Sequence, residues 1–165
     1  MDSVGELVKF DCSNNDLMTL DVSQCLKLEE LNCSGNQLME LDVGHQTQLT
    51  QLDCSNNKLT ELNVKQNGSL TSLICNDNQL TTLDLSHNHS LSKLNCAKNR
   101  LACLDVTGIS GGTITANGNR RPIAVRTDGK FDLTTLSGFN VGKATNWNGG
   151  SVSGTILTVE DGKDE

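Results

Sequence analysis

The sequence has few aromatic residues, a single proline and no long apolar run. Its 165 residues include three Phe, one Trp and no Tyr, so ring side chains are too few to build the main core. No stretch of 18 apolar residues occurs, which argues against a transmembrane helix. Cationic side chains are also in the minority, because 13 Lys and Arg stand against 20 Asp and Glu, giving a net charge of −7. An acidic chain of this kind argues against a nucleic-acid partner.

What the sequence has instead is a repeat of 21 residues, with a cysteine and, three positions later, an asparagine in every unit. We call each unit a row and number the rows one to five in the order of their cysteines. The five pairs are Cys12 and Asn15, Cys33 and Asn36, Cys54 and Asn57, Cys75 and Asn78, and Cys96 and Asn99. A fixed period of this size indicates stacked units that bury their apolar faces only against each other.

Leucines at constant offsets surround each pair, and they predict short strands. In row two, Leu31 and Cys33 alternate with polar residues, so both point inward in an extended segment. Successive strands are expected to lie side by side in a parallel sheet, roughly 4.8 Å apart. The second half of the row repeats the spacing with Leu38, Leu41 and Val43. We therefore expect each row to contain two strand-and-turn halves.

The pattern LxxLxCxxNxL resembles a leucine-rich repeat in which cysteine replaces the usual third leucine. It is similar to the nested 21-residue class of bacterial leucine-rich repeats, whose cysteine ladder occurs in internalin-type surface proteins. The resemblance covers Leu7 to about Ile109. The expected fold is mainly β: a leucine-rich-repeat solenoid of short parallel strands with five full rows. A row of this length leaves no room for an outer helix of ~10 residues.

The repeat weakens towards the C-terminus, which divides the chain into two parts. Residues 1–109 are predicted to form the solenoid, and residues 110–165 a degenerate capping repeat followed by a small β-rich module. Ile114, Ala116 and Asn119 echo Leu31, Cys33 and Asn36 with the spacing off by a residue, as expected for an atypical terminal row. A further strand is predicted at Thr155–Val159.

The ladder cysteines are interpreted as small buried hydrophobic residues. In-register strands hold their side chains about one strand spacing apart, whereas a disulfide needs Cβ atoms near ~3.8 Å. Zinc needs four ligands that converge, which a line of thiols does not supply. Cys103 occupies a slot expected to face outward and is a candidate reactive thiol whose role stays open. Asn67-Gly-Ser69 and Asn88-His-Ser90 match the glycosylation pattern by chance, in our interpretation.

A second ladder, of aspartates, is expected to face solvent on the second half of the rows. Its members are Asp21, Asp42, Asp84 and Asp105, with Asn63 between them. Stacked carboxylates repel, and calcium would relieve that repulsion because it prefers oxygen ligands. We favour the alternative, in which these acids are hydrogen-bonded to neighbours and kept apart by Asn63. No metal site, cofactor or catalytic motif is therefore predicted, and the chain is not expected to be an enzyme.

The candidate binding face comprises outward positions on the first strands that vary between rows while the core does not. These positions are Lys9, Asp11, Glu30, Asn32, Gln51, Asp53, Ser72, Ile74, Lys93 and Asn95. An invariant frame with variable display residues is how repeat proteins offer an extended surface. We expect adhesion or protein recognition, with a protein or glycan ligand, and the resemblance implies a secreted or surface protein and a host-derived ligand.

The same observations leave a second interpretation open, in which the face is merely solvated. The chain would then be a cytosolic or periplasmic scaffold without a ligand on this segment. A signal and an anchor, if the chain is displayed on a surface, are expected outside this sequence. A monomer is expected, and an end-to-end dimer through the open edge of the first strand is the alternative.

Overall fold

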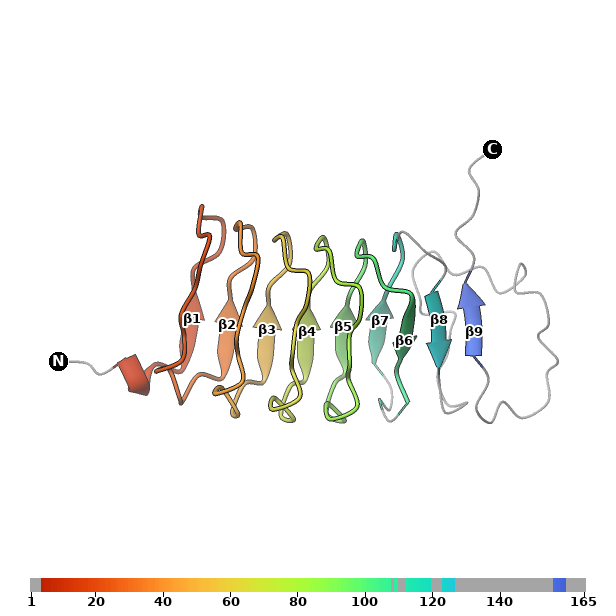
Figure 1. The fold of residues 1–165 in the computed structure, drawn as a ribbon. Helices are drawn as coiled ribbons and strands as arrows, with labels where there is room; N and C mark the ends of the chain where they lie inside the picture. The colour runs from red at the N-terminus through yellow and green to blue at the C-terminus, as the bar shows by residue number, and fades with distance from the viewer. Residues whose placement is uncertain (1–3, 108, 110–111, 120–122, 127–155, 160–165) are drawn as a thin grey trace.

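The computed structural model describes residues 4–107, 109, 112–119, 123–126 and 156–159. Within them the chain winds as a solenoid in which each row contributes one short strand to a common sheet (Figure 1). A 3-10 helix, η1 (Val4–Glu6), precedes the first strand. The strands are β1 (Lys9–Asp11), β2 (Glu30–Asn32), β3 (Gln51–Asp53), β4 (Ser72–Ile74), β5 (Lys93–Asn95) and β7 (Thr113–Thr115). They form a six-stranded sheet in that order, here called sheet A, which confirms the predicted leucine-rich-repeat solenoid.

Every neighbouring pair in sheet A is parallel and in the register that the repeat predicts. Phe10 lies beside Leu31, which lies beside Leu52, an offset of 21 residues each time. Between β5 and β7 the offset falls to 20, because Leu94 pairs with Ile114. The terminal row therefore joins the same sheet one residue out of step, as its sequence indicated.

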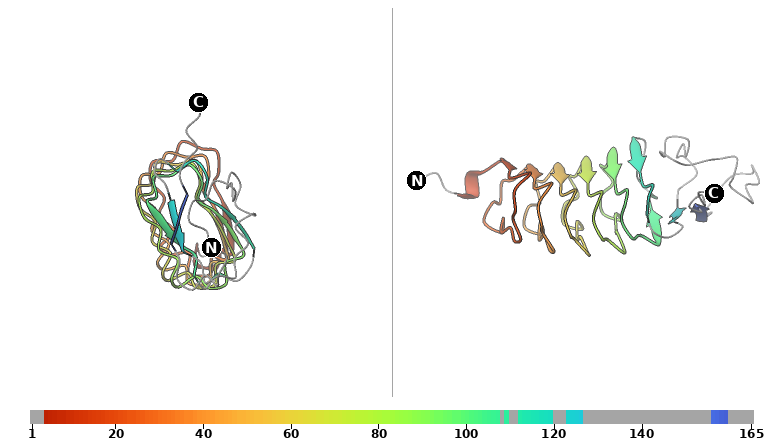
Figure 2. Two further views of the ribbon diagram at one scale, coloured as in Figure 1. Left: turned by 90° about the vertical axis from the view of Figure 1, so that its right-hand side faces the viewer. Right: turned by 90° about the horizontal axis from the view of Figure 1, so that it is seen from above.

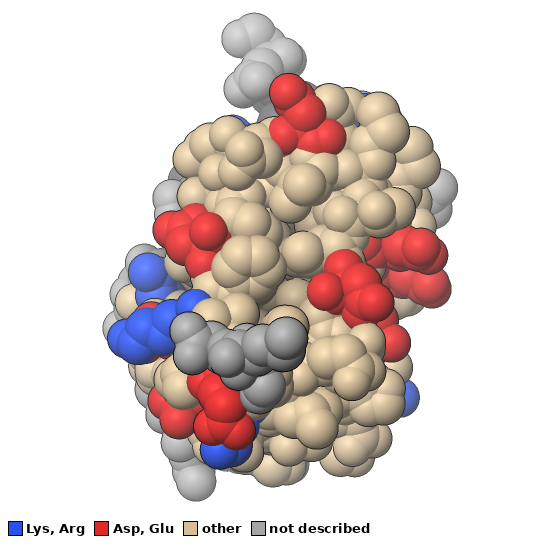
Figure 3. Space-filling model, turned by 90° about the vertical axis from the view of Figure 1, so that its left-hand side faces the viewer, with Lys and Arg blue, Asp and Glu red and all other residues tan. Residues whose placement is uncertain are grey.

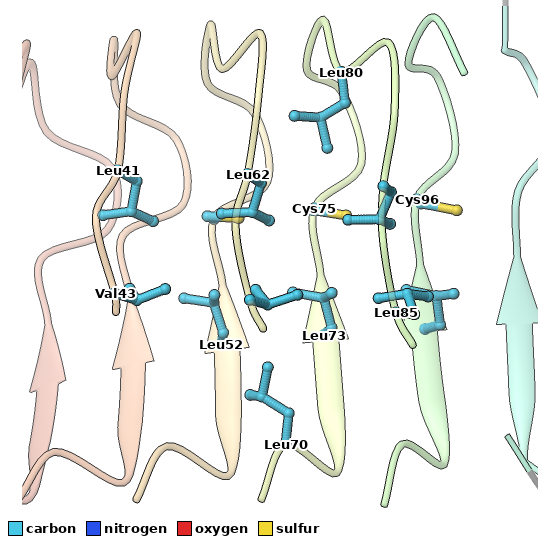
Figure 4. Packing of buried hydrophobic residues seen from close by; sticks show 14 of the residues in the cluster. Leu41, Val43, Leu52, Leu62, Leu70, Leu73, Cys75, Leu80, Leu85 and Cys96 are labelled. Atoms are coloured by element: carbon cyan, nitrogen blue, oxygen red, sulfur yellow. The ribbon is translucent and has the colours of Figure 1, made fainter. Parts of the chain in front are cut away.

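The second half of each row, residues 38–43 in row two, is here called the return segment. The core lies between sheet A and these return segments. Leucines at the centre of β2 to β5 point inward, and each is 2% exposed or less. Opposite them, Leu41, Val43 and their equivalents come from the return segment and meet the sheet side chains (Figure 4). Viewed along the axis, the rows superpose into one oval outline (Figure 2). A leucine ladder from each side thus replaces the aromatic core that the composition excludes.

The return segments differ from our expectation, because among the described residues only those of row five and of the terminal row form strands. In row five, β6 (Cys103–Asp105) pairs in parallel with β8 (Ile123–Arg126), which pairs antiparallel with β9 (Ile156–Val159). In rows one to four the prediction of a second strand is wrong. Among the described residues, one backbone hydrogen bond, such as Lys58 N–H to Leu38 O, joins successive rows at the start of the return segment. No ladder of backbone hydrogen bonds follows it. The apolar side chains of the return segments, such as Leu41 and Val43, are buried, but the segments of rows one to four do not pair with each other.

The strand predicted at Thr155–Val159 corresponds to β9 within one residue. Whether residues 110–165 form a module separate from the solenoid stays a prediction. No helix in the described part of the chain has the length and apolarity needed to cross a bilayer.

Candidate binding surface

The outer face of sheet A carries all ten residues predicted for the binding face. Each three-residue strand turns its central side chain into the core and its two flanking side chains outward. Parallel register aligns the flanking residues in two columns. One column holds Lys9, Glu30, Gln51, Ser72 and Lys93, and the other holds Asp11, Asn32, Asp53, Ile74 and Asn95. The structure therefore gathers the candidate residues on one surface, with exposure ranging from half-buried to exposed.

Polar contacts between rows fix several of these side chains. Lys9 Nζ lies 2.7 Å from Glu30 Oε1, and the hydrogen bond to Glu30 raises the pKa of Lys9. Asn32 Nδ2 donates to Asp11 Oδ2 at 3.2 Å. The backbone N–H of Ser13 donates to Asp11 Oδ1 at 2.9 Å, and this bond is the main cause of the lowered Asp11 pKa. The face is thus polar and partly preordered rather than a set of free side chains.

The asparagine ladder anchors the turn that follows each strand of this surface. Asn57 Nδ2 donates to Cys33 O at 3.0 Å and to Cys54 O at 3.1 Å, so it ties its own row to the preceding one. Its Oδ1 accepts the N–H of Leu38, also in the preceding row, at 3.0 Å. Asn36, Asn78 and Asn99 repeat these contacts. The predicted role of the ladder in satisfying turn backbone groups is confirmed.

Four of the five ladder cysteines are buried behind the face, and Cys12 is half-buried. Cys33, Cys54, Cys75 and Cys96 are 0% exposed, and all four are free thiols. Burial raises the pKa of Cys33 and of Cys96 to about 12 and that of the two central thiols well above the ordinary value. Neutral, enclosed thiols are poor nucleophiles and poor metal ligands. The structural interpretation of these cysteines is therefore supported, and Cys25 is buried as well. The side chain of Cys103 lies outside the described part of the structure.

A second set of side-chain amides, from Gln46, Asn67 and Asn88, lies in the turn after the return segment. Gln46 Nε2 donates to Val22 O at 2.7 Å, and Asn67 Nδ2 and Asn88 Nδ2 make the equivalent bonds one and two rows later. All three residues are 0% exposed. Because Asn67 and Asn88 are enclosed, neither glycosylation pattern is accessible in the folded chain.

On the return side, three aspartates of the ladder line a groove of about 750 Å³, together with Leu20, Leu41 and Leu62. Each acid caps its own turn, as when Asp42 accepts the N–H of Gly44 at 2.8 Å. Lys65 Nζ lies 3.0 Å from Asp84 Oδ2. Hydrogen bonds from Ser86, followed by that lysine, lower the Asp84 pKa.

These contacts agree with the predicted hydrogen bonding of the acids. Within the described ranges, no group of three His, Cys, Asp or Glu side chains is placed to hold a metal ion. The aspartates are instead satisfied one by one, by their own turns and by a neighbouring lysine.

Comparison with known proteins places the fold. No protein-family model and no curated protein sequence matched the chain. Among solved structures, it is similar to the functional domain of InlJ from Listeria monocytogenes, which includes a cysteine ladder, with 32% identity over 79% of this chain and a TM-score of 0.48. The leucine-rich-repeat domain of APL1B matches with 26% identity over 74% of the chain and a TM-score of 0.65. InlF of Listeria monocytogenes matches with 18% identity over 74% and a TM-score of 0.54.

The chain spans only 37%, 40% and 47% of the lengths of these three structures. The fold itself is settled: the chain is a leucine-rich-repeat solenoid that contains a cysteine ladder. Such solenoids present an extended, repeated surface suited to protein interaction.

Proposed function

We propose that this leucine-rich-repeat solenoid is a non-catalytic recognition module that binds a protein or glycan through the outer face of sheet A. One observation carries the proposal. The ten outward side chains change in charge and size from row to row, while the inward leucines, cysteines and asparagines of the same rows repeat. Variation confined to the exposed positions of a constant frame is the arrangement by which repeat proteins acquire partners.

The chemistry of the face favours a polar and multivalent contact. None of the ten side chains is aromatic, so the surface lacks the ring anchors that dominate tight protein interfaces. Carboxylate, amide and ammonium groups spread over five strands instead offer many hydrogen bonds of modest strength. Contacts such as Lys9–Glu30 already hold some of these groups, which reduces the entropy lost on binding. We infer micromolar affinity per module, strengthened where several modules engage one partner.

The non-catalytic assignment rests on the state of the reactive groups. The buried ladder thiols are neutral, and aspartates of the return side such as Asp21 and Asp42 are each occupied by a local turn. We further propose a secreted or surface location and a host-derived ligand, and the support for both is the resemblance to internalin-type repeats. Surface labelling of intact cells that express the parent gene tests the location: an unlabelled protein in intact cells that labels after lysis contradicts it.

The binding test compares two variants that remove charge from opposite sides of the solenoid. The first changes Glu30, Asp53 and Lys93 to alanine on sheet A. The control changes Glu40 and Glu61 to alanine on the return side, where both are exposed. Each protein is screened against extracellular proteins and glycans by surface plasmon resonance, with and without calcium.

Binding that the sheet variant weakens at least tenfold, and that the control variant retains, supports the proposal. Binding lost only in the control variant would move the site to the groove, and a calcium requirement would connect it with the aspartate ladder. A folded protein that binds nothing in the screen would favour the scaffold interpretation instead.

A further inference from the structure

We propose that the groove on the return side is a second binding site, which takes an extended peptide segment of a partner protein in which arginine and aliphatic residues alternate. Sheet A and the return segments lie on opposite sides of the solenoid (Figure 2), so the inference does not depend on what sheet A binds. It rests on three features of the groove: leucines in its lining, an excess of carboxylates, and two carboxylates that have no partner.

The leucines of the groove recur at one position in successive rows. Leu41, Leu62 and Leu83 hold this position in rows two to four and are 7% or 8% exposed, whereas the leucine three residues earlier in each row is 0% exposed. Leu41 and Leu62 line the groove itself. Leu83 lines a second hollow of about 360 Å³, which shares Thr82 and Asp84 with the groove. An aliphatic side chain laid against these leucines would gain free energy by leaving water.

The groove follows the part of the solenoid in which the return segments remain unpaired. Its lining comes from rows one to four, whose return segments form no strand among the described residues. The second hollow extends the lining to Thr107 in row five. Successive rows are roughly 4.8 Å apart, so the two hollows together cross roughly 19 Å, the length of an extended segment of about six residues.

The lining of the groove carries an excess of negative charge. Five carboxylates and one ammonium group belong to it, which gives a net charge of −4. The carboxylates are those of Asp21, Glu40, Asp42, Glu61 and Asp84, and the ammonium group is that of Lys65. Figure 3 looks along the solenoid axis and shows acidic side chains gathered at the right-hand edge, which is the return side. A groove lined mainly by charge of one sign attracts a ligand of the opposite sign, so the partner segment is basic.

Two of these carboxylates have no partner of their own. The aspartates accept backbone N–H groups of their own turns, and Lys65 also binds Asp84. Glu40 and Glu61 are exposed, and within the described residues neither forms a hydrogen bond or an ion pair. They hold the same position in neighbouring rows, roughly 4.8 Å apart along the axis, where like charges repel. A guanidinium group between them would remove this repulsion and donate to both carboxylates, which favours arginine in the partner.

A segment with alternating residues uses the leucines and the carboxylates together. Successive side chains of an extended chain point to opposite sides, so aliphatic residues at every second position can all face the leucines. The arginines between them are long enough to bend back to the carboxylates, with their methylene groups along the apolar surface. A second copy of this chain is a poor occupant, because its net charge of −7 would be repelled by the groove.

The first test compares three probes on the unchanged protein by isothermal titration calorimetry, at about 0.1 M salt, where charges interact over about 10 Å. The probes are a capped peptide of three Arg-Leu repeats, a capped peptide of three Arg-Ser repeats, and spermine. The Arg-Leu peptide should bind with a stoichiometry of one to one. The Arg-Ser peptide and spermine should bind at least about tenfold more weakly, because neither brings leucine side chains to the lining.

The second test locates the site with two variants that lose the same charge. Glu40→Gln with Glu61→Gln removes the unpartnered carboxylates of the groove. Glu30→Gln with Asp53→Asn is the matched control and removes two carboxylates from the outer face of sheet A. The groove variant should bind the Arg-Leu peptide at least about fivefold more weakly, and the control should bind it within about twofold of the unchanged protein. Circular dichroism checks that both variants are folded.

Three results would overturn the proposal. The first is an unchanged protein that does not bind the Arg-Leu peptide at about 1 mM. The second is an Arg-Ser peptide or spermine that binds as tightly as the Arg-Leu peptide, because the leucines of the lining would then contribute nothing. The third is equal weakening in the two variants, because the attraction would then come from the net charge of the chain and not from the groove.

Discussion

The asparagine ladder offers the sharpest test of how the rows are held together, through the substitution Asn57→Ala. In the folded chain Asn57 is 8% exposed and reaches into the preceding row. The Leu38 N–H donates to Asn57 Oδ1, and this is its only hydrogen bond within the described residues. Asn57 Nδ2 donates to Cys33 O, Cys54 O and Ser55 O, each of which keeps another donor. Alanine therefore orphans one buried donor and weakens three acceptors.

The expected cost follows from these contacts. An unsatisfied buried N–H costs about 1–3 kcal/mol, and each lost bond to a carbonyl that retains a partner about 0.5 kcal/mol. The free energy of unfolding should fall by about 3 kcal/mol. Asn15→Ala is the matched control, because Asn15 is exposed and donates only to Cys12 O and Ser13 O in its own row. It should cost less than about 0.5 kcal/mol, as surface changes do.

Urea unfolding followed by circular dichroism measures both values. With a slope of about 2 kcal/mol/M, Asn57→Ala should lower the midpoint by about 1.5 M, while Asn15→Ala should barely move it. Equal shifts in the two variants would refute the reasoning, since burial and the reach into the preceding row would then contribute nothing. A changed slope in Asn57→Ala would indicate that the solenoid had separated into two unfolding units.

Three further expectations concern the core, the thiols and acid. Leu73→Ala, under sheet A, should lower the free energy of unfolding by about 3 kcal/mol, whereas Ser72→Ala should change it by less than about 0.5 kcal/mol in the same urea assay. The buried ladder cysteines should react with a thiol reagent at pH 8 about 1000-fold more slowly in the folded than in the unfolded protein, because a pKa of about 12 leaves little thiolate. Mass spectrometry measures the labelling, and rapid labelling of these cysteines in the folded protein would contradict the expectation. The pKa of Asp84 is lowered in the folded state, so its contribution is present above pH ~4 and is lost as the pH falls further. Thermal unfolding between about pH 5 and pH 2 should therefore depend less steeply on pH in Asp84→Asn than in the unchanged protein.

The architecture of sheet A was predictable because its signals are local and repeated. Leu52 and Cys54 alternate with polar residues, which determines that both point inward. An asparagine equivalent to Asn57 recurs every 21 residues, and this recurrence sets the register. The side-chain amide of Asn57 donates to one carbonyl in its own row and to one in the row before. The positions of the candidate face follow from the same alternation, although the sequence alone says nothing of what binds there.

The return segments show where such reasoning ends. Leu41 and Val43 repeat the spacing of Leu31 and Cys33, and both are buried as predicted. Spacing along one chain determines which side chains face inward, but it carries no information on whether neighbouring segments approach closely enough to exchange backbone hydrogen bonds. Pairing of β6 with β8, where Leu104 lies beside Val125, is a contact of that second kind. The sheet containing β9 was likewise not derivable from the repeat.

The constant register between rows also bears on how a chain of this type can change length over evolution. The side chains of Asn36, Asn57, Asn78 and Asn99 form hydrogen bonds only within their own row and with the one before it. A duplicated or deleted row would therefore find the same neighbours on both sides, with no compensating change in the core. Selection can lengthen or shorten the outer face of sheet A by whole rows, in steps of roughly 4.8 Å, while the contacts between neighbouring rows stay the same.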